Sequence, residues 1–338
     1  MSALVSRPVR SPMNIPGASS VLSWHSMLRC SSVVLNTTLY ATGSGPPPVV
    51  TLTGTLTRFA DFRIEVTTGG ARGTAVFRWS DDGGTTWTSG VTTAATTVLG
   101  TTGITLAWPV GTYATDNVYV GKVVQWNDSS GHGWNYENLL SVNGSQLPRL
   151  VKNTTTGRWC LRFQKTAQTF LRIGSSTYCN SVCGGNDTPF TIFTVAGVYG
   201  TVGTQHFIHS ITDTTLSTSE ISLFAYTNSQ WGASKRGSSG AEIFTTGGTV
   251  DNTGVHVFEH YQPGTTVSLL VDGSAAINAA AQDTPSATLS EAFLGGIRSG
   301  ANIYGDVDVY AQIVYSGARS GDERGFARQL LKARYNTP

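Results

Sequence analysis

The feature that most constrains the fold is an alternation of apolar and polar residues in short runs. Phe62, Ile64 and Val66 alternate with polar neighbours, and the segments 75–79 and 104–108 repeat the pattern. A period of two places the apolar side chains on one face of a strand. The chain also carries 39 glycines among many serines and threonines, residues that disfavour helices and suit tight turns. We therefore predict an all-β protein.

Charge is sparse and evenly spread. Charged residues make up 12% of the chain and the formal net charge is +2, whereas an average domain has roughly 25% charged residues. Scattered arginines do not suit nucleic acid, whose binding needs concentrated positive charge. No apolar run approaches the roughly 20 residues of a membrane-spanning helix. Neither nucleic acid nor a membrane is therefore an expected partner.

The N-terminal segment is rich in proline. Residues 1–16 contain Pro8, Pro12 and Pro16 and lack the apolar core of a secretory signal. We expect an extended N-terminal arm, and synthesis in a cytoplasm without a signal peptide.

Cys30, Cys160, Cys179 and Cys183 are too few for a disulfide framework in a chain of 338 residues. Buried or turn thiols are the favoured interpretation, and a disulfide formed after release into an oxidising medium is the alternative. Zinc would need further ligands at suitable spacing, which the sequence does not offer.

A stiff stretch, Gly45-Pro46-Pro47-Pro48, is typical of a domain boundary. Short strands recur closely beyond it, which predicts a small β-sandwich over 46–121. Ser320 and Glu323, near the other end of the chain, have the spacing of a capping box. Phe326 and Leu330 share a helical face at i,i+4, so a C-terminal helix is expected there. Further strands are expected at 159–163, 190–195, 221–226, 255–261, 267–271, 292–297 and 307–315.

Several motifs carry a family resemblance. The segment 126–133, Trp-Asn-Asp-Ser-Ser-Gly-His-Gly, resembles the W-x-D-x-S-G-x-G turn of concanavalin A-like, laminin-G-type jelly rolls. Segments 158–163, 255–257, 267–273 and 305–315 are similar, in the same order, to later strands of that family. The resemblance implies a lectin-like jelly-roll domain built from 17–45 and 122–338. The small sandwich, 46–121, would then be an insertion, which folds tolerate where strand ends meet at the surface.

The inserted segment is similar to small β-domains of tailed-bacteriophage structural proteins. The combination implies a non-enzymatic virion component, such as a capsid decoration, neck or collar, or tail or fibre protein, located in the virion and assembled in the host cytoplasm. Other virion proteins are the expected partners, through the N-terminal arm and the sandwich edges. Exposed sheet edges often associate, so we expect a homo-oligomer or lattice contacts.

One motif belongs to sialidases. Ser80, Asp82, Gly84 and Trp87 fit the S-x-D-x-G-x-T-W pattern of the Asp box. The pattern occurs once, whereas a propeller would repeat it on each blade. We therefore predict a structural turn, in which Asp bonds backbone N–H groups. Structural turns are also predicted at Asp128 with Gly131 and at Asp272 with Gly273.

Two enzyme patterns fail on geometry or composition. The segment 256–260 spells H-x-x-E-H, a zinc-protease pattern that needs a helix. On a strand, His256 and His260 would lie about 13 Å apart with Glu259 on the opposite face. A glycosidase needs a pair of carboxylates about 5–10 Å apart, and the E-x-D-x-x-E strand of jelly-roll glucanases is absent. We predict no catalytic residues, and a polysaccharide hydrolase is the least favoured alternative.

Glycan binding to a host surface is the leading alternative function. Aromatic rings provide flat apolar faces with polar tips, suited to sugar rings, although the same aromatics also cover sandwich edges. Asp128 is a weak calcium candidate, since such sites need several oxygen ligands, and no other metal or cofactor is expected. The glycan-binding candidates are Trp134, Asn135, Tyr136, Tyr226, Asn228 and Trp231.

Overall fold

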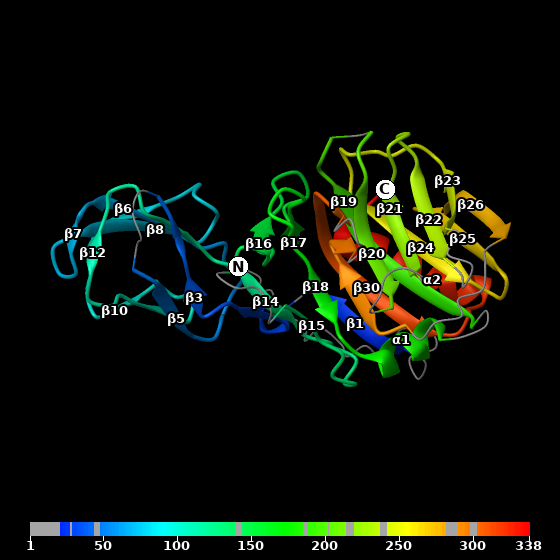
Figure 1. Ribbon diagram of the computed structural model, residues 1–338, viewed down its shortest axis with the longest axis horizontal. Coiled ribbons are helices and arrows are strands. Elements are labelled where there is room, and N and C mark those ends of the chain that lie inside the picture. Colours follow the sequence, from blue (N-terminus) through cyan, green and yellow to red (C-terminus); the bar gives the residue numbers. More distant parts are fainter. Residues whose placement is uncertain are drawn as a thin grey trace, which may run out of the picture.

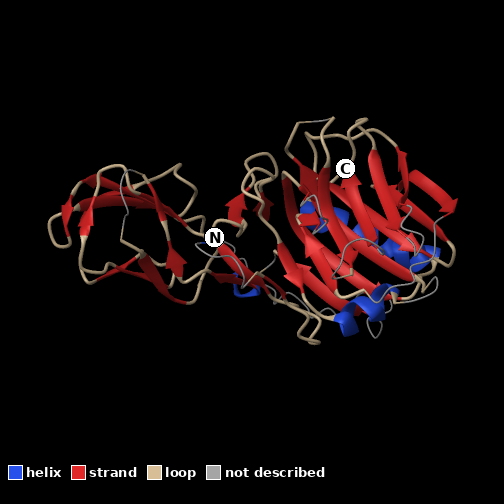
Figure 2. Cartoon of the chain, in the orientation of Figure 1, coloured by secondary structure: helices blue, strands red, loops and turns tan. Residues whose placement is uncertain are grey.

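The computed structural model describes residues 21–27, 29–43, 48–138, 144–184, 188–201, 203–213, 220–236, 242–281, 289–297 and 303–338. They form two lobes (Figure 1), and strands dominate both (Figure 2). These ranges hold two α-helices, α1 (Ser176–Cys183) and α2 (Gly321–Tyr335), and a 3-10 turn at Cys30–Ser32. The prediction of an all-β sandwich with a C-terminal helix is confirmed. The expected arm, 1–16, lies outside the described residues.

The larger lobe consists of two packed sheets and a short hairpin. The first sheet has the order β16-β17-β30-β19-β24-β25-β26, with β1 also paired to β30, and the second has the order β2-β14-β15-β18-β27-β20-β21-β22-β23. The strands of the first sheet are β1 (Val21–Ser26), β16 (Arg149–Lys152), β17 (Trp159–Phe163), β19 (Phe190–Val198), β24 (His256–Gln262), β25 (Thr266–Val271), β26 (Ser274–Ala281) and β30 (Val307–Ser316). Those of the second sheet are β2 (Val33–Leu35), β14 (Val123–Trp126), β15 (Tyr136–Glu137), β18 (Leu171–Ile173), β20 (His206–Thr212), β21 (Glu220–Ala225), β22 (Trp231–Arg236), β23 (Glu242–Gly247) and β27 (Glu291–Leu294), and the hairpin is β28 (Gly296–Ile297) with β29 (Ile303–Tyr304).

The central strands of the first sheet are buried on both faces. β19 is buried along its whole length and β30 along all but its last residue. One face packs against the second sheet and the other against α2, which explains why these strands are apolar without clear alternation. Helix α2 begins at the capping box of Ser320 and Glu323. Its buried face is Ala327, Leu331 and Tyr335, one position on from the predicted face, and Phe326 is 49% exposed.

The residues of the H-x-x-E-H pattern lie on strand β24. His260 points into the sandwich, where its Nδ1 lies 3.3 Å from Nε2 of His209. Glu259 points to the opposite face, as predicted for a strand. There its carboxylate pairs with Arg324 at 3.1 Å and with Arg328 at 2.6 Å, both on α2. The motif therefore joins the helix to the sheet.

We expect Glu259→Ala to destabilise the larger lobe, because it leaves two guanidinium groups of α2 without their carboxylate. Breaking such a buried pair costs roughly 3–5 kcal/mol, measurable by urea unfolding. Gln329→Ala, on the exposed side of the same helix, is the control and should change stability by less than about 0.5 kcal/mol. Equal stabilities of the two variants would contradict the role of Glu259.

The smaller lobe is a second sandwich, with sheets of order β10-β11-β5-β3 and β4-β13-β6-β8-β9 and a ribbon β12-β7. Its core includes Phe77 and Trp108, whose ring centroids lie 4.6 Å apart. Residues 38–42, which the predicted division assigned to the jelly roll, pair with strands of these small sheets. The strands are β3 (Thr38–Leu39), β4 (Ala41–Thr42), β5 (Val50–Gly54), β6 (Arg63–Thr68), β7 (Gly70–Ala71), β8 (Val76–Ser80), β9 (Thr88–Thr92), β10 (Thr96–Val98), β11 (Ile104–Ala107), β12 (Thr112–Tyr113) and β13 (Val118–Val120).

The Asp-box segment forms a hydrogen-bonded turn after β8. Asp82 Oδ1 accepts from the backbone N–H groups of Thr85 at 2.9 Å and Thr86 at 2.8 Å, and from Ser80 Oγ at 2.6 Å. Slight burial acts to raise the pKa of Asp82, but these hydrogen bonds outweigh it and lower the pKa to about 2. Gly84 has a φ of 104°, and the guanidinium of Arg78 lies 4.2 Å from the Trp87 ring centroid. Each residue of the motif thus has a structural role.

Two antiparallel strand pairs connect the lobes. The chain leaves the second large sheet after β2 and returns through β14, and these strands pair with Leu35 opposite Val123. Asn36 N donates to Lys122 O at 2.8 Å, and β4 pairs with β13 on the far side of this neck. Across the junction, the rings of Phe59 and Trp159 stack at 5.6 Å. Figure 1 shows the small lobe (blue to cyan) extending from the large one at this point.

The four cysteines, all within the described ranges, form no disulfide. Cys30 is half-buried, and its Sγ donates to Leu56 O at 3.3 Å. Cys160, Cys179 and Cys183 are buried. Burial, with a further contribution from Glu291, raises the pKa of Cys179 to about 12, which makes it a poor nucleophile.

Candidate binding site at the junction of the lobes

Asp128, the predicted calcium candidate, accepts hydrogen bonds from the backbone of two separate segments. Asp128 Oδ1 accepts from Trp24 N at 2.9 Å and Ser130 N at 2.8 Å. Its Oδ2 accepts from Ser130 Oγ at 2.7 Å and Trp134 N at 3.3 Å. Four hydrogen bonds occupy this carboxylate, and the described residues contain no group of three or more His, Cys, Asp or Glu side chains that could hold a metal ion, so the calcium candidate at Asp128 gains no support and stays a prediction. With Gly131 at a φ of 94°, the turn ties β1 to the end of β14.

The aromatics that follow this turn belong to the interior. Tyr136 is 2% exposed, and its hydroxyl donates to Gln312 Oε1 at 2.7 Å between the sheets. Trp134 is half-buried against Tyr178, with ring centroids 5.5 Å apart. Asn135 Oδ1 accepts from Asp128 N at 2.8 Å. The prediction of a sugar platform is therefore wrong for Tyr136, whose ring has no exposed face.

The second group of predicted glycan-binding residues, Tyr226, Asn228 and Trp231, also contains a buried aromatic residue. Trp231 is 2% exposed and packs edge-on against Phe258 at 4.7 Å, so its prediction as a glycan-binding residue is also wrong. Tyr226 and Asn228 lie in the turn between β21 and β22, where Asn228 Nδ2 donates to Gln230 Oε1 at 2.7 Å. The strands β15 and β21 are four places apart in the second sheet. That separation is roughly 20 Å, so the two predicted groups do not form one site.

The turn at Asp272 and Gly273 closes β25 and β26, with φ angles of 54° and 96°. Asp272 Oδ1 accepts from Val257 N at 2.9 Å, and its Oδ2 lies 2.6 Å from Nδ1 of His256. The carboxylate therefore fixes the neighbouring strand β24, a structural role.

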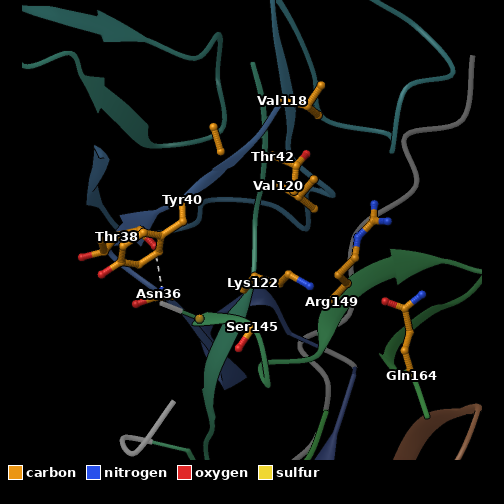
Figure 3. A pocket seen from close by; sticks show the side chains of 12 residues that line it. Asn36, Thr38, Tyr40, Thr42, Val118, Val120, Lys122, Ser145, Arg149 and Gln164 are labelled. Carbon is orange, nitrogen blue, oxygen red and sulfur yellow. Dashed lines mark hydrogen bonds between the residues drawn. The ribbon is translucent and has the colours of Figure 1, made fainter. Parts of the chain in front are cut away.

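A pocket of about 400 Å³ opens at the neck between the lobes. Figure 3 shows Lys122 and Arg149 side by side in it, with Tyr40, Val118 and Val120 above them. Its lining comes from several segments of the chain: the linkers that precede β3 and β14, the strands β4, β13 and β16, and the residue after β17. The remaining lining residues are Asn36, Thr38, Ala41, Thr42, Gly144, Ser145 and Gln164.

The pocket carries an excess of positive charge. Arg149 Nη2 donates to both carboxylate oxygens of Asp61, at 2.9 and 3.1 Å. Lys122 forms no ion pair with a carboxylate of the described ranges. Burial first, and the neighbouring Arg149 second, lower the pKa of Lys122 to about 8, against the attraction of Asp61. Burial raises the pKa of Asp61, while Arg149 lowers it. Of these two cations, only Arg149 forms an ion pair with a carboxylate of the described ranges.

The lining suits an anion that also has hydroxyl and apolar faces. A carboxylate or similar group would receive charge-assisted hydrogen bonds from Lys122 and Arg149. The side chains of Thr38, Ser145 and Gln164 can donate to and accept from hydroxyls. Tyr40, which is 41% exposed, provides an aromatic surface. Sequence reasoning missed this site because its residues come from segments far apart in the chain, and no local motif marks them.

We expect Lys122→Met to stabilise the protein at pH 7 by an amount on the order of 2 kcal/mol, because it removes a half-buried ammonium that has no carboxylate partner in the described ranges. The folded-state pKa of Lys122, about 8, lies below the ordinary 10.5, so the unfolded chain holds the proton more tightly. The penalty is therefore complete below pH 8 and disappears between about pH 8 and 10.5.

Urea unfolding of both proteins at pH 7 and pH 10 measures this difference. Lys152→Met, an exposed lysine at the end of β16, is the control and should leave the pH dependence unchanged. A gain for Lys122→Met that is as large at pH 10 as at pH 7 would contradict the shifted pKa.

Comparison with known proteins gives distant structural similarity. The chain matches no protein-family model and no curated protein. A sialidase of Trypanosoma rangeli in complex with 2,3-difluorosialic acid is 15% identical with a TM-score of 0.45, and the match covers 59% of this chain and 30% of that one. NanB sialidase of Streptococcus pneumoniae is 10% identical with a TM-score of 0.37, covering 47% and 26%. The CBM40 of Ruminococcus gnavus IT-sialidase, bound to α2,3-sialyllactose, is 12% identical with a TM-score of 0.35, covering 41% and 81%.

These comparisons correct two predictions. A non-enzymatic virion component is contradicted, because the similar solved structures are sialidases and a sialidase module. The prediction that the chain has no enzymatic activity is contradicted by the same sialidases. At such low identity, and with TM-scores below 0.5, the likeness transfers no activity or residue role to this chain. The jelly-roll family resemblance, the virion location and partners, and the oligomeric state stay predictions.

Proposed function

We propose that the protein is a carbohydrate-binding β-sandwich that holds an acidic sugar in the junction pocket. The observation that carries the proposal is that Lys122 and Arg149 line one pocket, where Arg149 pairs with Asp61 and Lys122 forms no ion pair with a carboxylate of the described ranges. A bound carboxylate would balance the second cation. Such an anion would also raise the pKa of Lys122 and remove the cost of its burial.

The shape and the remaining side chains fit a sugar. A volume of about 400 Å³ falls in the range of small-ligand sites, roughly 300–1,000 Å³. The exposed ring of Tyr40 and the apolar side chains of Val118 and Val120 suit the C–H face of a pyranose. The polar groups of Thr38, Ser145 and Gln164 suit its hydroxyls. The comparison with a sialyllactose-bound module is compatible, but the proposal depends on the pocket itself.

The test compares two ligands that differ in one acidic sugar, α2,3-sialyllactose and lactose, by isothermal titration calorimetry. We expect the acidic ligand to bind at least tenfold more tightly, since a hydrogen bond to a charged group contributes about 1.5–3 kcal/mol. Lys122→Met should remove most of that difference, and Lys152→Met should not. Equal affinity for both ligands, or for wild type and Lys122→Met, would overturn the proposal.

The pH dependence is a second expected result. Binding of the acidic ligand should be constant from pH 6 to about pH 8 and weaken at higher pH, because the free protein loses the Lys122 proton near its pKa of about 8. Calorimetry at pH 7 and pH 9.5 measures the change. Lys122→Arg, which keeps its charge at both pH values, should remove the dependence. A wild-type affinity unchanged at pH 9.5 would contradict the role of the Lys122 ammonium.

A further inference from the structure

A second cavity lies beside the junction pocket. Its volume is about 190 Å³, and polar side chains line most of it. The turn between β16 and β17 forms one wall with Thr154 and Thr155. The loop before β24 forms another with Asn252 and Thr253, and Tyr199, after β19, also lines the cavity.

The strand register places the two cavities next to each other. Arg149 lines the junction pocket and is directly opposite Arg162 in the β16–β17 pair. Arg162 lines the second cavity and is opposite Asp308 on β30. Directly opposite residues point to the same face of a sheet, with Cβ atoms about 5 Å apart. Arg149, Arg162 and Asp308 therefore form one row across the outer face of the first sheet.

The row continues to a residue without a side chain. Asp308 is opposite Gly197 on β19, and a Cβ atom at Gly197 would lie 2.8 Å from Gly254 O. The glycine thus allows the loop before β24 to approach β19 closely. From β16 to β19 the row spans three inter-strand steps, on the order of 15 Å. This length exceeds a single sugar ring.

The second cavity differs from the first in charge. Arg162 donates from Nε and Nη2 to the two oxygens of Asp308, both at 2.7 Å, and Asn153 Nδ2 donates to the same carboxylate at 3.1 Å. The ion pair is therefore balanced within the protein, unlike the pair of cations beside it. Thr154 and Thr155 present hydroxyls, and Asn252 presents an amide that donates to Gly200 O at 3.3 Å. Such a lining favours an uncharged ligand rich in hydroxyls.

An aromatic ring completes the second cavity. Tyr199 is 37% exposed, and the guanidinium of Arg162 lies 4.6 Å from its ring centroid. The orientation of the ring is fixed, since its hydroxyl donates to Phe163 O. A fixed aromatic side chain beside neutral hydrogen-bonding groups is suited to a sugar ring.

We propose that the second cavity is a subsite for a neutral sugar, continuous with the junction pocket, so that the ligand is an oligosaccharide with an acidic sugar followed by neutral ones. This inference rests on the proposed function, because it takes the acidic sugar in the junction pocket as its starting point. The Arg149–Arg162 row would lie beneath the linkage between the two sugars.

The test uses N-acetylneuraminic acid and α2,3-sialyllactose, which share the acidic sugar and differ in the neutral ones. We expect the trisaccharide to bind about tenfold more tightly to wild type. Tyr199→Ala should lower its affinity to that of the monosaccharide and leave the monosaccharide unchanged. Phe326→Ala, another exposed aromatic truncated on α2, is the matched control and should change neither.

A smaller substitution tests the second cavity in case Tyr199→Ala fails to fold. Thr155→Val removes one exposed hydroxyl at nearly constant volume, and we expect it to weaken trisaccharide binding about threefold. Equal binding of the two ligands to wild type, or an equal loss of both in Tyr199→Ala, would overturn the second subsite while leaving the junction pocket intact. Binding of neither ligand, or equal binding of both by Lys122→Met and wild type, would overturn the proposed function instead.

Discussion

The antiparallel pairing of β2 with β14 is the constraint on which the rest of the structure depends. It brings together two points of the chain, Leu35 and Val123, between which the whole smaller lobe is formed. Because the chain leaves and returns side by side, the smaller lobe adds to the larger sandwich without breaking its sheets. The pair β4 and β13 continues the same two chain segments into the smaller lobe, so two segments that run side by side, rather than a single linker, connect the lobes.

This crossing also creates the candidate site. Asn36 and Lys122 lie at the point where the linkers run past each other, and Arg149 reaches across from the larger lobe to Asp61. Burying Arg149 requires a carboxylate, and Asp61 supplies it. Lys122 has no such partner among the described residues, and burial, with Arg149 nearby, lowers its pKa. A site that is electrostatically incomplete without an anion is a reasonable place for an anion to bind.

The outer face of the first sheet has two uses. Its central part is covered by α2, which Arg324 and Arg328 hold to Glu259. The part nearest the junction carries the row of Arg149, Arg162 and Asp308 instead. The two halves differ because the helix ends its coverage at apolar residues such as Val151 and Tyr310. Beyond them polar side chains replace the apolar contact, and the second cavity opens there, while Arg149 at the sheet edge lines the junction pocket.

The sequence by itself determined the secondary-structure class, the C-terminal capping box and the turns at Asp82, Asp128 and Asp272. These features depend on period-two alternation and on short-range hydrogen bonds between neighbouring residues. It also predicted that the H-x-x-E-H residues would lie on opposite faces of a strand. It misplaced the helix face by one position, and it took the buried Tyr136 and Trp231 for surface residues, because burial depends on which element packs above each side chain. Only the tertiary structure brought Lys122, Arg149 and Tyr40 to one pocket and aligned Arg162 beside it, since strand register and the crossing at the neck, rather than any local motif, decide which distant residues meet.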